Sequence, residues 1–415
     1  MAGHVVVVGA GMAGLRAAEQ LRAAGWDRAI TVVGAEEHLP YNRPPLSKEL
    51  LAGRIGRGGV AEAHAATEFR RRKSVEDVTW RLGTPVARAA LGSRRLTLAD
   101  GTDLTYDGLV VATGLRPRRA VIPGPEFGRH VLRTLDDALA LRERLAPGRS
   151  VAVVGGGFIG CEVAATARLA GCDVTVVEPC HEPMERSLGP ELGRVLRQHH
   201  EDQGVRFVTG RIVSELLSDG PCERVAAAVL DDGTLVPADL VVESVGSRPN
   251  VEWLQGNGLD LHDGVLCDNQ LRVEGLPGVV AVGDVARFPN PRYDDVPRRV
   301  EHWCVPNDTA KRAATTLASH LGVRPQDDSP FTPLPSFWSD QYGVRVQSYG
   351  APALGARCVL LDGGLDHPRA LTGGVAMAYY SDRQMVGVVL VGIPASEHRR
   401  YRELLNGGLA PAAAA

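Results

Sequence analysis

Two similar segments constrain the fold of this chain more than any other feature of its sequence. Residues 100–117, DGTDLTYDGLVVATGLRP, align without gaps on residues 232–249, DGTLVPADLVVESVGSRP, with eight identical positions among eighteen. Upstream of each copy an apolar run leads into a glycine-rich turn, VVVVGAGMAG at 5–14 and VAVVGGGFIG at 151–160. The chain therefore contains two related units, each with the expected order strand, glycine turn, helix, strand, β-excursion and closing strand.

The spacing of these landmarks places the remaining segments. The glycine turns are 146 residues apart but the DGT segments only 132, so the first unit holds 14 extra residues, and YNRPPLSK at 41–48 lies among them. A third glycine signal, VVAVGD at 279–284, belongs to neither copy and is predicted to return to the first unit. From about residue 330 the chain shows short β-like runs without another glycine turn, which indicates a smaller final domain.

The predicted fold class is α/β, with two doubly wound, Rossmann-like dinucleotide-binding domains and a small C-terminal α+β domain. We expect residues 1–115 and 249–327 to form a discontinuous first domain, residues 116–248 an inserted second domain, and residues 328–408 the C-terminal domain, which would act as an interface domain. The low-complexity end LAPAAAA, residues 409–415, is expected to be disordered.

Charge and cysteine content exclude several classes of function. The net charge of −3 gives no positive field that would attract nucleic acid or an anionic membrane, and no apolar run approaches the roughly 20 residues of a membrane span. A strand signal from His4 leaves no room for a secretory leader, so we expect a cytoplasmic protein. The seven cysteines include no C-x-x-C pair, which predicts reduced thiols and no metal site.

The glycine turns indicate dinucleotide binding. In Gly9-Ala10-Gly11-Met12-Ala13-Gly14, glycine permits a tight turn, close approach of a pyrophosphate and close packing of the following helix, whose N-terminus supplies N–H donors. One such motif is weak evidence, but this one follows an apolar strand and recurs at Gly155, Gly157 and Gly160. Both units are therefore predicted to bind a dinucleotide.

An acidic residue distinguishes the two predicted sites. Glu178 ends a predicted strand 23 residues after Gly155, where its carboxylate can accept protons from both ribose hydroxyls of NAD and would repel a 2′-phosphate. We expect NADH rather than NADPH, with Arg186 as the residue that could relax the choice. The first unit has Gly34 at the corresponding place, so Glu36 is the candidate there.

The motifs GAGMAG, PYNRPPLSKELL, ATGLRPR, GGGFIGCEVA, VGSRPN, VAVGD, EHW and FWSDQYG occur in an order that resembles FAD-dependent ferredoxin reductases of the putidaredoxin reductase and biphenyl dioxygenase ferredoxin reductase type. The resemblance extends from about residue 4 to residue 405. It implies a glutathione-reductase-like fold in which FAD binds the first unit together with residues 249–327, and NADH binds the inserted unit. We expect a monomer or weak dimer.

The resemblance and the glycine turns together give the expected site residues. The FAD site would comprise Gly9, Gly11, Ala13, Gly14, Glu36, Arg43, Lys48, Thr113, Gly114, Arg116, Gly283, Asp284, Glu301, His302, Trp303 and Trp338. The NAD site would comprise Gly155, Gly157, Phe158, Ile159, Gly160, Glu162, Glu178, Arg186 and Gly246. Lys48, Glu162, Glu301 and Trp338 are expected at the junction of flavin and nicotinamide, where Lys48 would approach flavin N5 with Glu162 as its counter-ion.

Two departures refine this expectation. The family pattern after the tryptophan often shows a small residue and a glutamine, whereas this chain has Cys304-Val305-Pro306-Asn307-Asp308. Related disulfide reductases carry a redox cysteine in the first unit, but this sequence has none before Cys161. The electrons are therefore expected to pass from the flavin, one at a time, to an iron–sulfur ferredoxin that serves a monooxygenase or a Rieske dioxygenase.

Ferredoxins are generally acidic, so basic groups near the flavin edge would steer docking. Arg298 and Arg299 are candidates, whereas a solvated helix end explains the basic run from Arg70 to Lys73 equally well. Two alternatives stay open. The first is a reductase of the same architecture that acts on rubredoxin, a quinone or monodehydroascorbate, and the second is an NADH-sensing interaction protein similar to apoptosis-inducing factor.

Overall fold

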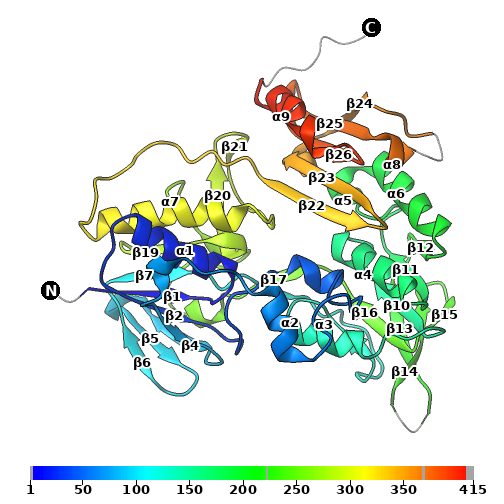
Figure 1. Cartoon of the computed structure of the whole chain (residues 1–415), viewed down its shortest axis with the longest axis horizontal. Helices are drawn as coiled ribbons and strands as arrows, with labels where there is room; N and C mark the ends of the chain where they lie inside the picture. The colour runs from blue at the N-terminus through cyan, green and yellow to red at the C-terminus, as the bar shows by residue number, and fades with distance from the viewer. Residues whose placement is uncertain (1–2, 221–222, 367–369, 408–415) are drawn as a thin grey trace. The chain divides into compact units, whose positions relative to one another are not determined.

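The computed structural model describes residues 3–220, 223–366 and 370–407 (Figure 1). By their contacts, residues 1–42, 67–116 and 247–335 form one compact unit, called unit 1 below, and residues 43–66, 117–246 and 336–415 form a second, called unit 2. The predicted disordered end, residues 409–415, lies outside the described residues. Among the described helices, none combines the length and apolar character that a membrane span requires.

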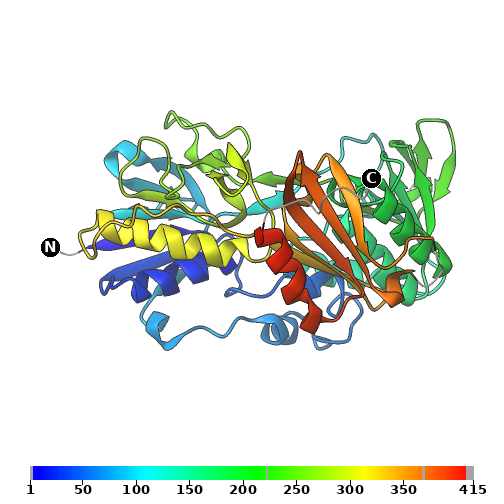
Figure 2. The same cartoon turned by 90° about the horizontal axis from the view of Figure 1, so that it is seen from above.

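Unit 1 is built on a five-stranded parallel sheet in the order β19-β7-β1-β2-β3. Its strands are β1 (His4–Val8), β2 (Ala29–Val33), β3 (Thr79–Arg81), β7 (Gly108–Val111) and β19 (Val279–Ala281). The valines of β1 are fully or almost fully buried, as expected for a central parallel strand covered on both faces. Helices α1 (Met12–Ala23) and α7 (Val305–His320) lie side by side (Figure 2).

The third glycine signal returns to unit 1, as predicted. Strand β19 pairs in parallel with β7, with Val279 opposite Leu109, and so closes the sheet on that side. The predicted β-excursion is the antiparallel sheet of β4 (Val86–Ala90), β5 (Arg95–Leu98) and β6 (Asp103–Thr105). A second small sheet contains β18 (Val265–Leu266), β20 (Ala286–Asn290) and β21 (Asp294–Arg299).

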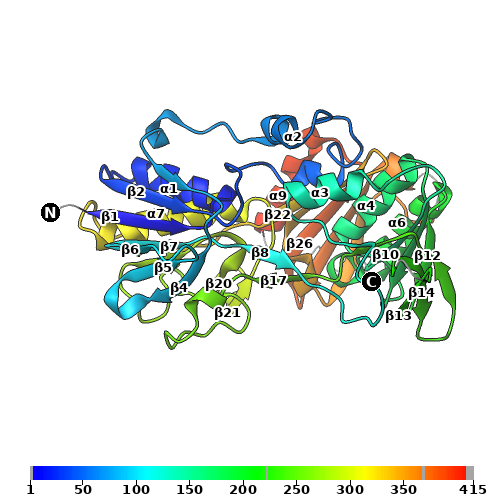
Figure 3. The ribbon, with the colours of Figure 1, turned by 90° about the horizontal axis from the view of Figure 1, so that it is seen from below.

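Unit 2 repeats this plan with the parallel order β12-β11-β10-β16-β9. Its strands are β9 (Arg129–His130), β10 (Ser150–Val154), β11 (Asp173–Glu178), β12 (Arg206–Thr209) and β16 (Leu240–Glu243), and its helices are α3 (Leu135–Arg142), α4 (Phe158–Leu169), α5 (Glu185–Leu188) and α6 (Pro190–Asp202). The fifth strand here precedes the glycine turn in the chain, whereas β19 follows it. The excursion of β13 (Val213–Ser218), β14 (Val225–Leu230) and β15 (Leu235–Pro237) lies beside the parallel sheet (Figure 3).

The residues shared by the two repeats have structural roles. Asp107 and Asp239 each accept a hydrogen bond at Oδ2 from the backbone N–H that begins the central strand, of His4 at 2.8 Å and of Ser150 at 2.9 Å. Gly101 and Gly233 adopt positive φ angles of 84° and 83° in the predicted hairpin turns. Part of the repeat therefore reflects folding rather than binding.

The C-terminal segment forms an antiparallel sheet in the order β22-β23-β26-β25-β24. Its elements are β22 (Ser336–Gln341), β23 (Val344–Gly350), β24 (Arg357–Asp362), α8 (Ala370–Gly373), β25 (Val375–Ser381), β26 (Gln384–Val391) and α9 (His398–Gly407). Together with the two doubly wound sheets, this sheet confirms the predicted fold class.

Segment 43–66 differs from the sequence-based expectation. It groups with unit 2 by its contacts, although the sequence placed it in the first domain. It contains the short 3₁₀ turn Pro44–Ser47 and all of α2 (Val60–Thr67) except the last residue. The chain leaves and re-enters unit 1 through β8 (Leu115–Pro117) and β17 (Ser247–Pro249), which pair as a two-stranded sheet.

Candidate functional site

The outer glycines of both turns are required by packing within the protein. Gly9 has a φ of 119°, and a Cβ there would overlap the carbonyl oxygen of Ala112. Gly155 has a φ of 102°, and a Cβ there would overlap the carbonyl oxygen of Ser244. Side chains on Gly14 and Gly160 would overlap the carbonyl oxygens of Gly9 and Gly155, respectively. These four residues let each helix lie close to the end of its strand.

The middle glycines, Gly11 and Gly157, have no such packing reason. Their φ angles of −85° and −73° suit any residue, and a Cβ on either would meet no atom within 4 Å. Because these two glycines have no side chain, open space remains beside the N-termini of α1 and α4. Neither helix has a capping side chain or an acidic residue in its first turn, so the first N–H groups suit an anionic ligand. The cradle fits a dinucleotide pyrophosphate.

The register of the strands explains why only unit 2 carries an acid after its second strand. Val8 lies opposite Val33 and Val154 opposite Val177, so Gly34 and Glu178 occupy equivalent positions. A Cβ on Gly34 would lie only 2.5 Å from that of Ala10, whereas unit 2 has Gly156 at the place of Ala10. A small residue in the turn therefore makes room for the acid in unit 2, and Ala10 excludes one in unit 1.

The two predicted ribose acids are held by different partners. Glu178 is 8% exposed and accepts hydrogen bonds from the backbone N–H of Gly156 at 2.6 Å and of Cys180 at 2.9 Å. Arg186 on α5 interacts with the Cys180 side chain next to it. In unit 1, Tyr41 donates its hydroxyl to Glu36 at 2.5 Å. Hydrogen bonds within the protein therefore orient both carboxylates.

Lys48 and Glu162 meet inside unit 2 in a largely buried ion pair. The Lys48 Nζ lies 2.6 Å from Glu162 Oε2, and the two side chains are 16% and 7% exposed. Ser47 Oγ donates to the same oxygen at 2.6 Å, and Ser339 Oγ donates to Oε1 at 2.6 Å. Lys48 also donates to the carbonyl of Pro44 at 3.1 Å. Every oxygen of the buried carboxylate thus has a donor, as burial of a charge requires.

Helix α4 also anchors the backbone of the segment that carries Lys48. Thr166, one helical turn after Glu162, donates its hydroxyl to the carbonyl of Ser47 at 2.7 Å. Arg43, at the start of the segment, donates to the carbonyl of Arg133 at 2.5 Å. The helix that opens the second glycine turn therefore fixes the position of the lysine. Sequence reasoning missed Ser47 and Thr166, although Ser47 lies within the RPPLSK motif.

The residues predicted after the closing strand of unit 1 are held by one another. Thr113 donates its hydroxyl to the carbonyl of Asn250 at 2.7 Å, and the Asn250 amide returns a hydrogen bond to the Thr113 carbonyl at 3.0 Å. Gly114 has a φ of 59°, and its counterpart in the repeat, Gly246, has one of 96°. Arg116 pairs with Glu252 at 2.5 Å and donates to Asn250 Oδ1 at 2.9 Å. Its guanidinium is thus engaged within the protein.

The VAVGD turn lies against the first glycine turn. A Cβ on Gly283 would come within 2.8 Å of the Ala13 Cβ, so the two turns approach closely, and the Gly283 N–H donates to Thr309 Oγ1 at 2.9 Å. This contact places Asp284, the middle residue of the short turn Gly283–Val285, next to the predicted pyrophosphate site.

The EHW segment has a distinct environment for each residue. Glu301 accepts hydrogen bonds from Ser247 Oγ at 2.9 and 3.0 Å and from Arg299 at 2.9 Å. Removal from water lowers the pKa of His302 to about 4, so its imidazole is neutral at pH 7. Trp303 stacks on Phe69, with ring centroids 6.1 Å apart.

The remaining predicted residues belong to unit 2. Trp338 lies on β22, where it pairs with Gln347, and its neighbour Phe337 makes an edge contact with Phe158 at 4.8 Å. Ile159, the next residue of α4, is 45% exposed. Arg43, Lys48 and Trp338 thus belong to unit 2, whereas the other residues predicted to bind FAD belong to unit 1.

The basic and cysteine side chains named in the sequence are mostly engaged or buried. Arg298 forms a two-armed pair with Asp294 at 2.5 and 2.8 Å, and Arg299 is 10% exposed and pairs with Asp263. Burial, followed by the charges of Glu178 and Glu162, raises the pKa of the Cys161 thiol. Cys161 is therefore an unreactive thiol at neutral pH.

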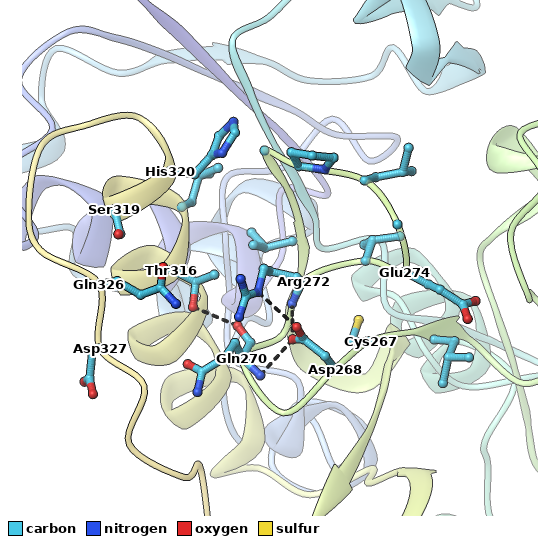
Figure 4. A pocket seen from close by; sticks show the side chains of 18 residues that line it. Cys267, Asp268, Gln270, Arg272, Glu274, Thr316, Ser319, His320, Gln326 and Asp327 are labelled. Atoms are coloured by element: carbon cyan, nitrogen blue, oxygen red, sulfur yellow. Dashed lines mark hydrogen bonds and ion pairs between the residues drawn. The ribbon is translucent and has the colours of Figure 1, made fainter.

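A separate cavity lies in unit 1, between the segment 266–280 and the C-terminal end of α7 (Figure 4). It has a volume of about 740 Å³, and its polar lining includes Asp268, Arg272, Thr316 and His320. Arg272 already pairs with Asp268 at 2.9 Å. None of the residues predicted to bind a dinucleotide lines this cavity.

Comparison with known proteins identifies the family. The description "Pyridine nucleotide-disulphide oxidoreductase" matches residues 3–306, and "Reductase C-terminal" matches residues 336–415. The chain is 36% identical over 395 residues to the ferredoxin–NAD(+) reductase component of the p-cumate 2,3-dioxygenase system of Pseudomonas putida, which covers 94% of this chain and 90% of that protein.

Two further relatives agree. Putidaredoxin reductase of Pseudomonas putida is 35% identical over 84% of this chain and 80% of its own. The crystal structure of the ferredoxin reductase for the CYP199A2 system from Rhodopseudomonas palustris superposes with a TM-score of 0.86 at 33% identity and covers 98% of this chain and 95% of that one. The chain therefore belongs to the pyridine nucleotide-disulphide oxidoreductase family, within which it is an FAD-containing ferredoxin reductase that takes its electrons from NADH.

Proposed function

We propose that FAD binds at the first glycine turn, that NADH binds at the second, and that the Lys48–Glu162 pair serves the transfer of hydride between them. The observation that carries this proposal is the buried ion pair, which sits on the helix opened by the second turn and has every carboxylate oxygen satisfied. FAD supplies the chemistry when bound, since it accepts a hydride and releases single electrons. The protein residues position the cofactors and provide the electrostatic environment of the site.

The two cradles have different tasks in this proposal. At the first turn, Gly9, Gly11, Ala13 and Gly14 would hold the FAD pyrophosphate, with Glu36 toward the ribose. Gly283 and Asp284 would face the ribityl chain, and the proximity of Gly283 to Ala13 supports this. Thr113, Gly114 and Arg116 would support the flavin end through Asn250. Glu301, His302, Trp303 and Trp338 would line the flat rings, since aromatic planes suit stacking.

At the second turn, Gly155, Gly157 and Gly160 would hold the NADH pyrophosphate, with Phe158, Ile159 and Gly246 around it. Glu178 would accept hydrogen bonds from the ribose hydroxyls, and its charge disfavours the 2′-phosphate of NADPH. Arg186 lies near Cys180 and not in an ion pair among the described residues, so it is the residue that would moderate this preference.

Lys48 would direct its ammonium toward flavin N5, together with Arg43 at the start of the same segment. An ammonium that is 16% exposed needs a compensating charge, which Glu162 provides. The hydrogen bond from Thr166 to the carbonyl of Ser47 holds the backbone next to Lys48 in place. The pair would thus prepare the site for negative charge that arrives with the hydride.

The acceptor in this proposal is an acidic iron–sulfur ferredoxin that serves a terminal oxygenase. The names of the relatives, which belong to a dioxygenase system and to a CYP199A2 system, support this class of acceptor. Arg298, about one third exposed, is a better candidate for docking than the buried Arg299. We further propose a cytoplasmic monomer or weak dimer, in keeping with the free cysteines at the six described positions.

The substitution Glu162→Gln tests the role of the ion pair. It removes the compensating charge while keeping the shape, so we expect NADH to reduce the bound flavin at least about tenfold more slowly. Stopped-flow absorbance under anaerobic conditions measures this rate directly. An unchanged rate would remove Glu162 from the proposal.

A further inference from the structure

A polar chain runs from Glu162 into the C-terminal sheet and ends at a buried histidine. Ser339 on β22 donates to Glu162 Oε1 at 2.6 Å. Gln341, two residues further along the same strand, donates from Nε2 to Ser339 Oγ at 3.1 Å. His200 on α6 lies with Nε2 2.7 Å from Gln341 Oε1. All these residues belong to unit 2, although they come from three distant parts of the sequence.

The donor and acceptor roles in this series of hydrogen bonds follow from the negative charge of Glu162 at its end. An ionised carboxylate only accepts hydrogen bonds, so the Ser339 hydroxyl must donate to Glu162 and must itself accept from the next group. Only the amide nitrogen of Gln341 can donate there, which turns the amide oxygen toward His200. The imidazole must then carry its proton on Nε2. Each member therefore points its positive end toward Glu162.

Burial makes this arrangement costly unless it serves a purpose. Ser339 and His200 are fully buried, and Gln341 is 1% exposed. The other ring nitrogen of His200, Nδ1, has no hydrogen-bond partner among the described residues. An apolar side chain would fill the same space without leaving a buried acceptor unsatisfied. Removal from water also lowers the pKa of His200 to about 4, which keeps the imidazole neutral, as the chain requires.

We propose that Ser339, Gln341 and His200 are positioning residues for the reductive step, which orient the Glu162 carboxylate so that its other oxygen meets Lys48. This inference rests on the proposed function of Lys48 and Glu162. It assigns the C-terminal sheet a part in the reaction with NADH, beyond its place in the fold. Ser339 donates to Oε1 of Glu162, whereas Lys48 and Ser47 donate to Oε2, so the two carboxylate oxygens have separate donors.

The first test separates positioning from packing. In the FAD-loaded protein, Ser339→Ala should lower the limiting rate of flavin reduction about tenfold, the loss expected for one hydrogen bond to a charged group, and leave the Kd for NADH within about twofold. Ser348→Ala on β23 is the matched control, because Ser348 is also fully buried but its Oγ has no partner among the described residues. An unchanged rate in Ser339→Ala, or an equal loss in Ser348→Ala, would overturn the proposal.

The second test does not depend on turnover. Nitrogen NMR of the holoprotein with labelled histidine should show His200 as the neutral Nε2–H tautomer, its signal being assigned by its loss in His200→Gln. Glu162→Gln introduces an amide that can donate to Ser339, so the opposite tautomer should gain population in that variant. An unaltered His200 signal in Glu162→Gln contradicts the chain. If instead the His200 signal changes while Glu162→Gln reduces flavin at the normal rate, the hydrogen-bond series from Glu162 to His200 is confirmed but the proposed role of Glu162 in flavin reduction is wrong.

Discussion

At the scale of single residues, the six motif glycines of the two G-x-G-x-x-G turns separate into two groups by what a methyl group would meet. Gly9, Gly14 and their counterparts are fixed by backbone oxygens of the protein itself, whereas Gly11 and Gly157 face open space. The sequence motif alone treats all six alike. The same pairing of neighbours explains why Glu178 has no equivalent in unit 1, since Ala10 occupies the space that Gly156 leaves free.

This division predicts opposite effects for two neighbouring substitutions. Gly157→Ala should raise the Kd for NADH at least about tenfold, because the methyl group enters the pyrophosphate space, while the unfolding free energy changes by less than about 1 kcal/mol. Gly160→Ala is the matched control and should destabilise the fold, since its methyl group overlaps the Gly155 carbonyl. NADH titration and urea unfolding measure the two effects. Unaltered NADH affinity in Gly157→Ala would show that no ligand uses this space.

Sequence reasoning reached some of these residues and missed others for a physical reason. Lys48 and Glu162 were predicted as partners because each belongs to a distinctive motif of the family, and the structure brings them together at 2.6 Å. Gln341 and His200 are 141 positions apart, and neither stands in a pattern that names the other. Their hydrogen bond forms because α6 lies next to β22 in the folded protein, and the local periodicity of the sequence does not predict this packing.

At the scale of elements, helix α6 and the C-terminal sheet bury a titratable group between them. His200 has a folded pKa of about 4 and an ordinary value of 6.5, so between these values the unfolded chain binds more protons than the folded one. Stability contributed by the neutral imidazole is therefore present above pH 6.5 and is lost as the pH falls toward 4.

The unfolding free energy should accordingly decrease by about 2 kcal/mol between pH 7 and pH 5 on account of His200 alone. In His200→Gln, which keeps a donor toward Gln341 but does not titrate, this decrease should be smaller by that amount. Urea unfolding of the holoprotein at the two pH values gives the comparison. His262→Gln at an exposed position is the control and should behave as the unsubstituted protein. Equal pH dependence in all three proteins would contradict the buried neutral imidazole.

The arrangement of elements was predicted unevenly. The central strands, the glycine turns and the excursions follow from the repeat, because apolar runs and glycine turns are local signals. Segment 43–66 carries no such signal: its short 3₁₀ turn is held to unit 2 by side-chain contacts, such as the Lys48–Glu162 ion pair and the hydrogen bond from Thr166 to Ser47. Its grouping with unit 2 is therefore a tertiary property. The fifth strands likewise differ in their position along the chain, because β9 precedes the glycine turn of its unit and β19 follows the glycine turn of its own.

At the scale of the whole molecule, one chain supplies two dinucleotide cradles of the same design and distinguishes them by their neighbours. Asp284 and the EHW segment accompany the first cradle, and Glu178 and the buried ion pair accompany the second. The sequence has no cysteine before Cys161, and Cys161 is buried with a raised pKa. In the proposed function, electrons from NADH leave the bound flavin for a separate protein rather than for a thiol of this chain.

The most direct test of this account is an anaerobic titration of the FAD-loaded protein with NADH, followed by mixing with a candidate ferredoxin. One equivalent of NADH should bleach the flavin absorbance, and the reduced protein should then reduce about two equivalents of a one-electron ferredoxin as the flavin colour returns. The loss of the ferredoxin's own absorbance reports the second step. A flavin that NADH leaves oxidised, or a reduced flavin that returns no electrons to any ferredoxin, would contradict the account.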